Sequence, residues 1–155
     1  MNRSEINRIL SDAVSFFSKH QFYLPSWAFW SIKEWQSKGD EYDEIRTKRL
    51  GWDITDFGRG DFEKYGLTLF TLRNGDSSPD SSKNYCEKIM IAGHEQYTPE
   101  HYHVAKTEDI INRGAADLVM YSHGRPALRC AAEYRCPHPV RRRNQNSETA
   151  GAAPA

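Results

Sequence analysis

The sequence has no long apolar run, since nothing in its 155 residues approaches the roughly 18 consecutive apolar residues of a membrane-spanning helix. The first seven residues also lack the apolar core and the small-residue cleavage site of a secretory signal. Three cysteines, Cys86, Cys130 and Cys136, are too few for a disulfide framework. We therefore expect a protein of the reducing cytoplasm that has no membrane partner.

The chain also lacks net charge, because 21 Lys and Arg side chains balance 21 Asp and Glu side chains. A neutral chain gives no support to a nucleic-acid-binding function. The balance hides an asymmetry, however. Residues 1–120 carry 15 basic and 19 acidic side chains, whereas residues 121–155 carry six arginines and only two acidic residues. The neutrality is thus a cancellation between two unlike parts of the chain.

The last part of the sequence has few aliphatic side chains. Between Gly124 and Ala155, Leu128 and Val140 are the only Leu, Ile or Val residues, while Arg, Ala, Pro, Gly and Cys dominate. Such a segment has too little apolar surface to offset the entropy of ordering it. We predict a basic, disordered tail over 123–155. It is either a genuine extension or an out-of-frame translation of a GC-rich gene, and we favour the second.

Apolar residues at three- and four-residue spacing predict a helix near the N-terminus, ending near His20. Ser4 is expected to cap this helix. Further along, Ser31-x-x-Glu34 has the form of a capping box, which indicates a second, short helix. The apolar face of the first helix consists of Ile6, Ile9, Leu10, Ala13, Val14 and Phe17.

Beyond Gly51, short apolar segments alternate with turns, a pattern that is typical of strands. We expect strands at 67–72, 85–92, 101–104 and 118–121. Helices followed by short strands indicate a mainly β fold, with an antiparallel β domain and an N-terminal helical flank. The predicted organisation is a helical flank over 1–40, a β domain over 41–122 and the tail over 123–155.

The segment His101-Tyr102-His103 is the strongest chemical signal. On a strand, residues i and i+2 share a face, so both imidazoles would point the same way and suit a divalent transition metal. Glu108 can join them only if the chain bends or begins a new strand around 105–107. His-x-His alone fits an exposed histidine pair better than a metal site. With Glu108 included, we favour a metal site made of His101, His103 and Glu108.

The pattern His101-x-His103-x4-Glu108, followed by Gly114, resembles the first motif of the cupin superfamily, whose small β-barrels hold a metal inside. The segment 103–114 is similar to the signature of the D-lyxose ketol-isomerases. Gly93 lies eight positions before His101, which is a mild departure from the cupin spacing. Further segments resemble the same family in its order, so that the resemblance covers about residues 1–121: 3–7, 24–30, 50–58, 69–75 and 85–88.

The resemblance implies an aldose–ketose isomerase with a cupin-like β-barrel, acting on D-lyxose and D-xylulose, and on D-mannose and D-fructose. It implies a preference for manganese and leaves other divalent metals open. It implies that His101, His103 and Glu108 bind the metal with a fourth histidine from the second half of the barrel. Neither His123 nor His138 has the sequence context of that ligand. We therefore expect an incomplete barrel whose activity is much reduced or absent.

The chemistry of isomerisation assigns roles to nearby residues. A proton moves between C1 and C2 of the sugar through a cis-enediol, which requires a base and an electrophile for the developing oxyanion. Lys106 is the candidate for proton transfer, because a nearby dication favours its neutral form; a solvated turn lysine is an equal alternative. Asp109 could orient a ligand histidine or cap a turn. Arg113 could bind sugar hydroxyls or be structural.

Other side chains fit packing better than chemistry. Glu87 could reach the pocket, but a cross-strand pair with Lys or Arg is favoured. The four tryptophans, at 27, 30, 35 and 52, could stack on a sugar, but we favour core or interface packing. Cys130-x5-Cys136-x-His138 does not have a recognised zinc spacing.

Two further functions compete with the isomerase. The chain could be a non-catalytic, metal- or sugar-binding cupin-like protein, since one fold hosts many functions. It could also be a truncated product without function. The partner expected of the isomerase is a small-molecule sugar substrate. A homodimer formed through the N-terminal helices and the aromatic segment is plausible.

Overall fold

The computed structural model describes residues 1–76, 83–101, 108–114, 116–120, 128–130 and 135–136. It divides the chain into two compact units, Met1–Glu100 and His101–Ala155. Across these described residues, no helix combines the length and the apolar character that crossing a membrane requires.

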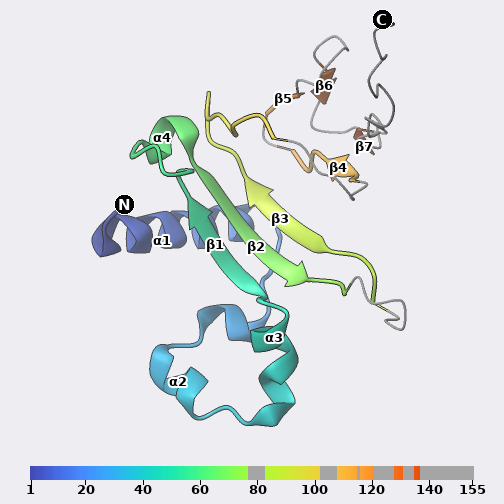
Figure 1. The fold of residues 1–155 in the computed structure, drawn as a ribbon. Coiled ribbons are helices and arrows are strands. Elements are labelled where there is room, and N and C mark those ends of the chain that lie inside the picture. The colour runs from blue at the N-terminus through green and yellow to red at the C-terminus, as the bar shows by residue number, and fades with distance from the viewer. Residues whose placement is uncertain (77–82, 102–107, 115, 121–127, 131–134, 137–155) are drawn as a thin grey trace, which may run out of the picture. The chain divides into compact units, whose positions relative to one another are not determined.

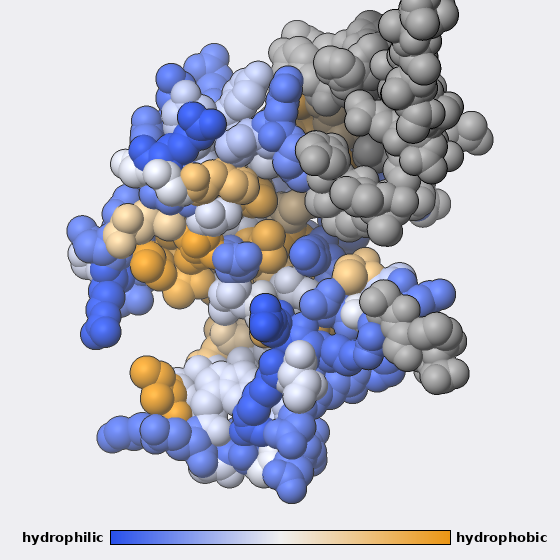
Figure 2. All heavy atoms as spheres, viewed as in Figure 1, coloured by the Kyte–Doolittle hydropathy of each residue, from blue (hydrophilic) through white to orange (hydrophobic). Residues whose placement is uncertain are grey.

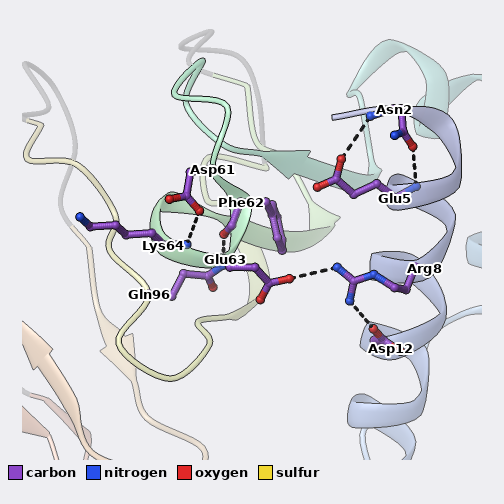
Figure 3. Close-up of polar contacts among 9 residues, drawn as sticks. All are labelled: Asn2, Glu5, Arg8, Asp12, Asp61, Phe62, Glu63, Lys64 and Gln96. Atoms are coloured by element: carbon purple, nitrogen blue, oxygen red, sulfur yellow. Dashed lines mark hydrogen bonds and ion pairs between the residues drawn. The ribbon is translucent and has the colours of Figure 1, made fainter.

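Helix α1 (Arg3–Lys19) forms where the apolar spacing predicts it (Figure 1). The side chain of Asn2 accepts a hydrogen bond from the backbone N–H of Glu5 at 2.9 Å, and the Glu5 carboxylate accepts one from the Asn2 N–H at 3.3 Å (Figure 3). The cap is therefore Asn2, and the prediction of Ser4 is wrong. The reason is that Asn2 has a glutamate three residues later, which completes a capping box.

Four short helical segments lead from α1 to the sheet. They are η1 (Ser26–Phe29), α2 (Ile32–Gln36), η2 (Asp40–Tyr42) and α3 (Asp43–Thr47). The predicted capping box is confirmed at the start of α2, where the backbone N–H of Ser31 donates to the Glu34 carboxylate at 2.7 Å. The backbone hydrogen bond and the side-chain hydrogen bond with Ser31 hold the pKa of Glu34 below its usual value.

Three strands form an antiparallel sheet in the order β1-β2-β3 (Figure 1). They are β1 (Gly51–Thr55), β2 (Leu67–Arg73) and β3 (Glu87–Ile91), with α4 (Phe62–Tyr65) between the first two. The strand predicted over 67–72 is confirmed, and β3 lies inside the one predicted over 85–92. The expected antiparallel β fold with N-terminal helices is therefore confirmed.

The aromatic side chains of the core gather on one face of this sheet. Phe70 of β2 is fully buried, and its ring centroid lies 4.9 Å from that of Trp27 and 5.1 Å from that of Trp52. Phe17 of α1 stacks on Trp52 from the helix side, at 6.0 Å. Figure 2 shows the hydrophobic residues of the first unit gathered in a band between hydrophilic ones. Helix α1 therefore packs on the same face as the aromatic side chains.

A network of polar contacts also ties α1 to α4 (Figure 3). The guanidinium of Arg8 lies 3.2 Å from Asp12 on its own helix and 3.0 Å from Glu63 of α4. The hydrogen bond with Glu63 is the largest cause that raises the pKa of Arg8. On the other side of α4, the carboxamide of Gln96 donates to the carbonyl oxygen of Phe62 at 2.6 Å.

The second unit contains two short antiparallel pairs. Strand β4 (Ile110–Ile111) pairs with β7 (Arg135–Cys136), and β5 (Leu118–Met120) pairs with β6 (Leu128–Cys130). Strand β5 confirms the strand expected from residue 118. Strands β6 and β7 hold the five residues of the predicted tail that the structure describes. The rest of 123–155 lies outside the described residues.

The strand expected over 101–104 is described only at its first residue. His101 lies in irregular chain, two residues after Pro99, which cannot donate a backbone hydrogen bond to a neighbouring strand. Residues 102–104 lie outside the described residues. The closed barrel of the cupin fold stays a prediction. The antiparallel strand pairs of the described residues are consistent with it.

Candidate functional site

The predicted metal ligands lie in the segment 101–108, of which the structure describes the two ends. His101 is exposed, and Glu108 is partly buried two residues before β4. His103 and Lys106 lie outside the described residues. Within the described part of the chain, no group of three His, Cys, Asp or Glu side chains is arranged to hold a metal ion. The three-ligand site therefore stays a prediction.

Asn112, four residues after the predicted ligand Glu108, makes two hydrogen bonds to the backbone that follows it. The Asn112 side chain accepts a hydrogen bond from the backbone N–H of Gly114 at 3.1 Å and donates one to the carbonyl oxygen of Ala116 at 2.8 Å. Gly114 has φ +124°, a conformation that other residues adopt only with strain. The glycine of the motif thus has a conformational role. Asp109 and Arg113 are both exposed, and their functional roles stay predictions.

Glu87 pairs across the sheet rather than standing free. The register of β2 and β3 places it opposite Arg73, and the guanidinium of Arg73 forms an ion pair with its carboxylate. The cross-strand interpretation of Glu87 is therefore confirmed. Glu87 therefore has a structural role in the sheet.

A recess of about 330 Å³ lies within the first unit, and all four tryptophans of the chain line it. The predicted packing role of the tryptophans is confirmed by their ring contacts, such as the edge-to-face pair of Trp30 and Trp35 at 5.0 Å. The indole N–H of Trp52 donates to the carbonyl oxygen of Ala28 at 3.0 Å. The other lining residues are Ala28, Ile45, Arg46, Arg49, Leu50, Gly51 and Phe70.

Sequence reasoning missed this recess. The available signal was the clustering of four indoles within 27–52, a segment that also holds several arginines and lysines. The contacts that create the recess are tertiary, because they join η1, α2 and α3 to strands β1 and β2. No spacing rule along the chain contains that information.

Charged side chains surround the recess. Arg46 donates to the Asp43 carboxylate at 2.7 Å and to the carbonyl oxygen of Lys38 at 2.8 Å. The ammonium of Lys38 lies 4.1 Å from the centroid of the Trp30 ring, a cation–π distance. On the far side of α3, a hydrogen bond from Lys83 is the main cause that lowers the pKa of Glu44.

Comparison with known proteins gives the family. A model of the D-lyxose isomerase family matches residues 1–133. The chain belongs to the D-lyxose isomerase family. The matched residues include the whole motif from His101 to Gly114, so the resemblance predicted from that motif is confirmed. The match also continues beyond residue 121, where the sequence resemblance was expected to stop.

Two curated members of the D-lyxose isomerase family show the extent of the similarity. The chain is 47% identical over 122 residues to a D-lyxose/D-mannose isomerase of Escherichia coli O157:H7, covering 77% of this chain and 54% of the relative. It is 44% identical over 127 residues to a D-lyxose/D-mannose isomerase of Serratia proteamaculans, covering 79% and 55%. The chain thus spans about half the length of the curated relatives it matches.

Proposed function

We propose that this chain is an aldose–ketose isomerase that interconverts D-lyxose and D-xylulose, and also D-mannose and D-fructose. The observation that carries the proposal is the family match over residues 1–133, which includes the His-x-His-x4-Glu motif. Two relatives that are nearly half identical to the matched part are named D-lyxose/D-mannose isomerases.

The proposed metal is Mn²⁺, with His101, His103 and Glu108 as its ligands. Two imidazole nitrogens and a carboxylate oxygen form a mixed donor set with open coordination positions. Such a set fits Mn²⁺ better than it fits a structural Zn²⁺ ion, whose four positions are all filled by protein ligands. Of the two described ligands, His101 is exposed and Glu108 is partly exposed, so an ion could reach both from solvent. When bound, the ion would supply an electrophile for the oxygen that becomes negatively charged.

Lys106 is the proposed proton carrier. A base removes the proton from C2 of the aldose and returns it to C1, while a hydroxyl proton moves from O2 to O1. A neutral Nζ of Lys106 could accept and return the carbon-bound proton. Glu87, the other side chain considered for the pocket, is engaged by Arg73 in the sheet. Lys106 is therefore the proposed proton carrier.

A second candidate function is binding without catalysis. Neither His123 nor His138 has the sequence context of the expected fourth ligand. Three ligands hold a metal more weakly and leave it more open to water. On this basis we propose that a site of these three ligands supports much lower turnover than a site of four.

The decisive experiment combines the purified chain with Mn²⁺ and D-lyxose in D₂O. An isomerase yields D-xylulose and incorporates deuterium at the carbon that receives the proton. A binding protein shows saturable binding of Mn²⁺ and D-lyxose without deuterium exchange. Absence of both binding and exchange would contradict both functions and support a product without function.

Location and assembly follow from the same proposal. We propose that the protein acts in the cytoplasm on a small sugar, as a homodimer, without a nucleic-acid or membrane partner. The thiol of Cys86 is free and exposed, as is typical of a reducing compartment. Size-exclusion chromatography with light scattering would test the dimer, and a monomer at all concentrations would contradict it.

A further inference from the structure

The tryptophan-lined recess plays no part in the proposed isomerisation, and none of its lining residues belongs to the motif 101–114. We propose that this recess binds an anionic monosaccharide, that is, a sugar ring carrying a carboxylate or a phosphate group. The proposal stands on the shape of the recess, on the aromatic side chains that line it and on one arginine, Arg49.

The recess has the size and lining that a monosaccharide needs. Its volume of about 330 Å³ is at the lower end of the roughly 300–1,000 Å³ of small-molecule sites. Indole faces offer broad apolar surfaces against which the C–H face of a sugar ring packs. All four indoles are partly exposed, so each offers some aromatic surface to a ligand. The ammonium of Lys38 already lies over the ring of Trp30 and the guanidinium of Arg46 over that of Trp35. The more open stacking surfaces are therefore those of Trp27 and Trp52.

The recess also has hydrogen-bond donors for sugar hydroxyls. The indole N–H of Trp52 already donates to the carbonyl oxygen of Ala28 at 3.0 Å. For Trp27, Trp30 and Trp35, no indole hydrogen bond exists within the described residues. Since a buried or half-buried indole N–H normally has a partner, donors that lack one are suited to a hydroxylated ligand.

The charge around the recess selects for an anion. The neighbouring cations are engaged, because Arg46 pairs with Asp43 at 2.7 Å and Lys48 pairs with Asp76 at 2.9 Å. Arg49 also lines the recess, but its guanidinium has no ion pair and no hydrogen bond to any described residue. A free guanidinium fork binds a carboxylate or phosphate group through two parallel hydrogen bonds.

The backbone of Arg49 offers a substitution that tests the side chain without straining the fold. Helix α3 ends in a Schellman motif, in which the N–H of Leu50 donates to the carbonyl oxygen of Ile45 at 3.0 Å and the N–H of Arg49 to that of Arg46 at 3.2 Å. Arg49 takes the left-handed conformation of this motif, with φ +52°, for which glycine is preferred. Glycine at this position would therefore remove the guanidinium and fit the backbone.

The test uses the tryptophans themselves as the probe. Intrinsic fluorescence of the full chain is titrated with D-glucose 6-phosphate, D-glucuronate, D-glucose and inorganic phosphate. We expect saturable changes with the first or second ligand, at concentrations at least about tenfold lower than with D-glucose or phosphate. Whichever of D-glucose 6-phosphate and D-glucuronate binds more tightly shows whether the recess prefers a phosphate or a carboxylate group. Equal affinities for all four ligands, or no saturable change, would overturn the proposal.

Two variants of one residue separate binding from folding. Arg49→Gly removes the guanidinium and relieves the left-handed backbone, so we expect about tenfold weaker binding or more together with an unchanged or higher unfolding midpoint. Arg49→Gln removes the charge and keeps a side chain, and should also weaken binding. The matched control is Arg3→Gln, which removes an exposed arginine of α1 and should bind like the parent. Parental affinity in both Arg49 variants would overturn the assignment.

Discussion

The ring of Phe70 stacks on that of Trp27, with centroids 4.9 Å apart and planes inclined by 29°. Phe70 is fully buried in the central strand of the sheet. We predict that Phe70→Ala lowers the free energy of unfolding by about 3–5 kcal/mol, because it removes buried apolar surface and leaves a cavity. Urea unfolding followed by circular dichroism would measure the change.

The matched control for this prediction is Phe29→Ala. Phe29 lies in η1, in the same aromatic segment as Trp27, but it is 56% exposed. Its truncation should change the free energy of unfolding by about 0.5 kcal/mol or less. Equal losses for the two variants would contradict the position of the core on the Phe70 face.

The cap of α1 provides a second prediction. Asn2→Ala removes the side chain that accepts from the Glu5 N–H, and should cost about 0.5–2 kcal/mol of stability. Ser4→Ala should cost less, because the Ser4 hydroxyl only donates to the Asn2 side chain, at 2.7 Å. Thermal unfolding of both variants measures the order. A larger loss of stability in Ser4→Ala than in Asn2→Ala would contradict Asn2 as the cap and support Ser4.

The ion pair of Glu44 with Lys83 predicts a dependence on pH. The pKa of Glu44 is lowered below 4.5 in the folded chain, chiefly by the hydrogen bond from Lys83. Its contribution to stability is therefore present above pH 4.5 and is lost as the pH falls through the lower, folded-state pKa. Urea unfolding between pH 6 and pH 3, values chosen to span roughly this window, should show a smaller loss in Glu44→Gln than in the parent.

The control for this effect is Glu95→Gln. Glu95 is exposed, and its carboxylate has no ion pair to any described residue. The pH profile of this variant should follow that of the parent. A Glu44→Gln profile identical to the parent would show that the ion pair with Lys83 does not contribute to stability in solution.

The proposed metal ligands provide a fourth prediction. His101→Gln and Glu108→Gln should each weaken Mn²⁺ binding by about tenfold or more, because each removes one of three proposed ligands. Electron paramagnetic resonance of free Mn²⁺ measures the affinity, and a chelator should remove the ion and any isomerase activity together. His94→Gln, which changes an exposed histidine outside the motif, should bind Mn²⁺ like the parent. Unchanged affinity in the two ligand variants would contradict the site.

The elements that the sequence predicts well are those with strong local patterns. The three- and four-residue spacing of Ile9, Ala13 and Phe17 predicts α1 and its buried face. The alternation in 67–72 predicts β2, and Ser31 with Glu34 predicts the start of α2. In each of these cases neighbouring residues carry the signal, so tertiary contacts are not needed to recognise it.

Other features depend on contacts between distant residues. Strand β1 has a short sequence without a clear period, and it is a strand because it pairs with β2. The recess is lined by Trp30 and Trp35 together with Trp52 of β1, an arrangement that no local rule predicts. For the candidate metal site, the sequence provides the ligand types and their spacing. The described residues include His101 and Glu108 but not His103. The mutual arrangement of the three ligands therefore stays a prediction.

The order of the strands has a consequence for how the protein is made. In the β1-β2-β3 sheet each strand pairs with its nearest neighbour in the sequence, and α1 precedes all three. Neighbouring pairings have low contact order, which favours fast folding. Because synthesis proceeds from the N-terminus, we expect the unit Met1–Glu100 to begin folding on the ribosome before the residues after it have been translated.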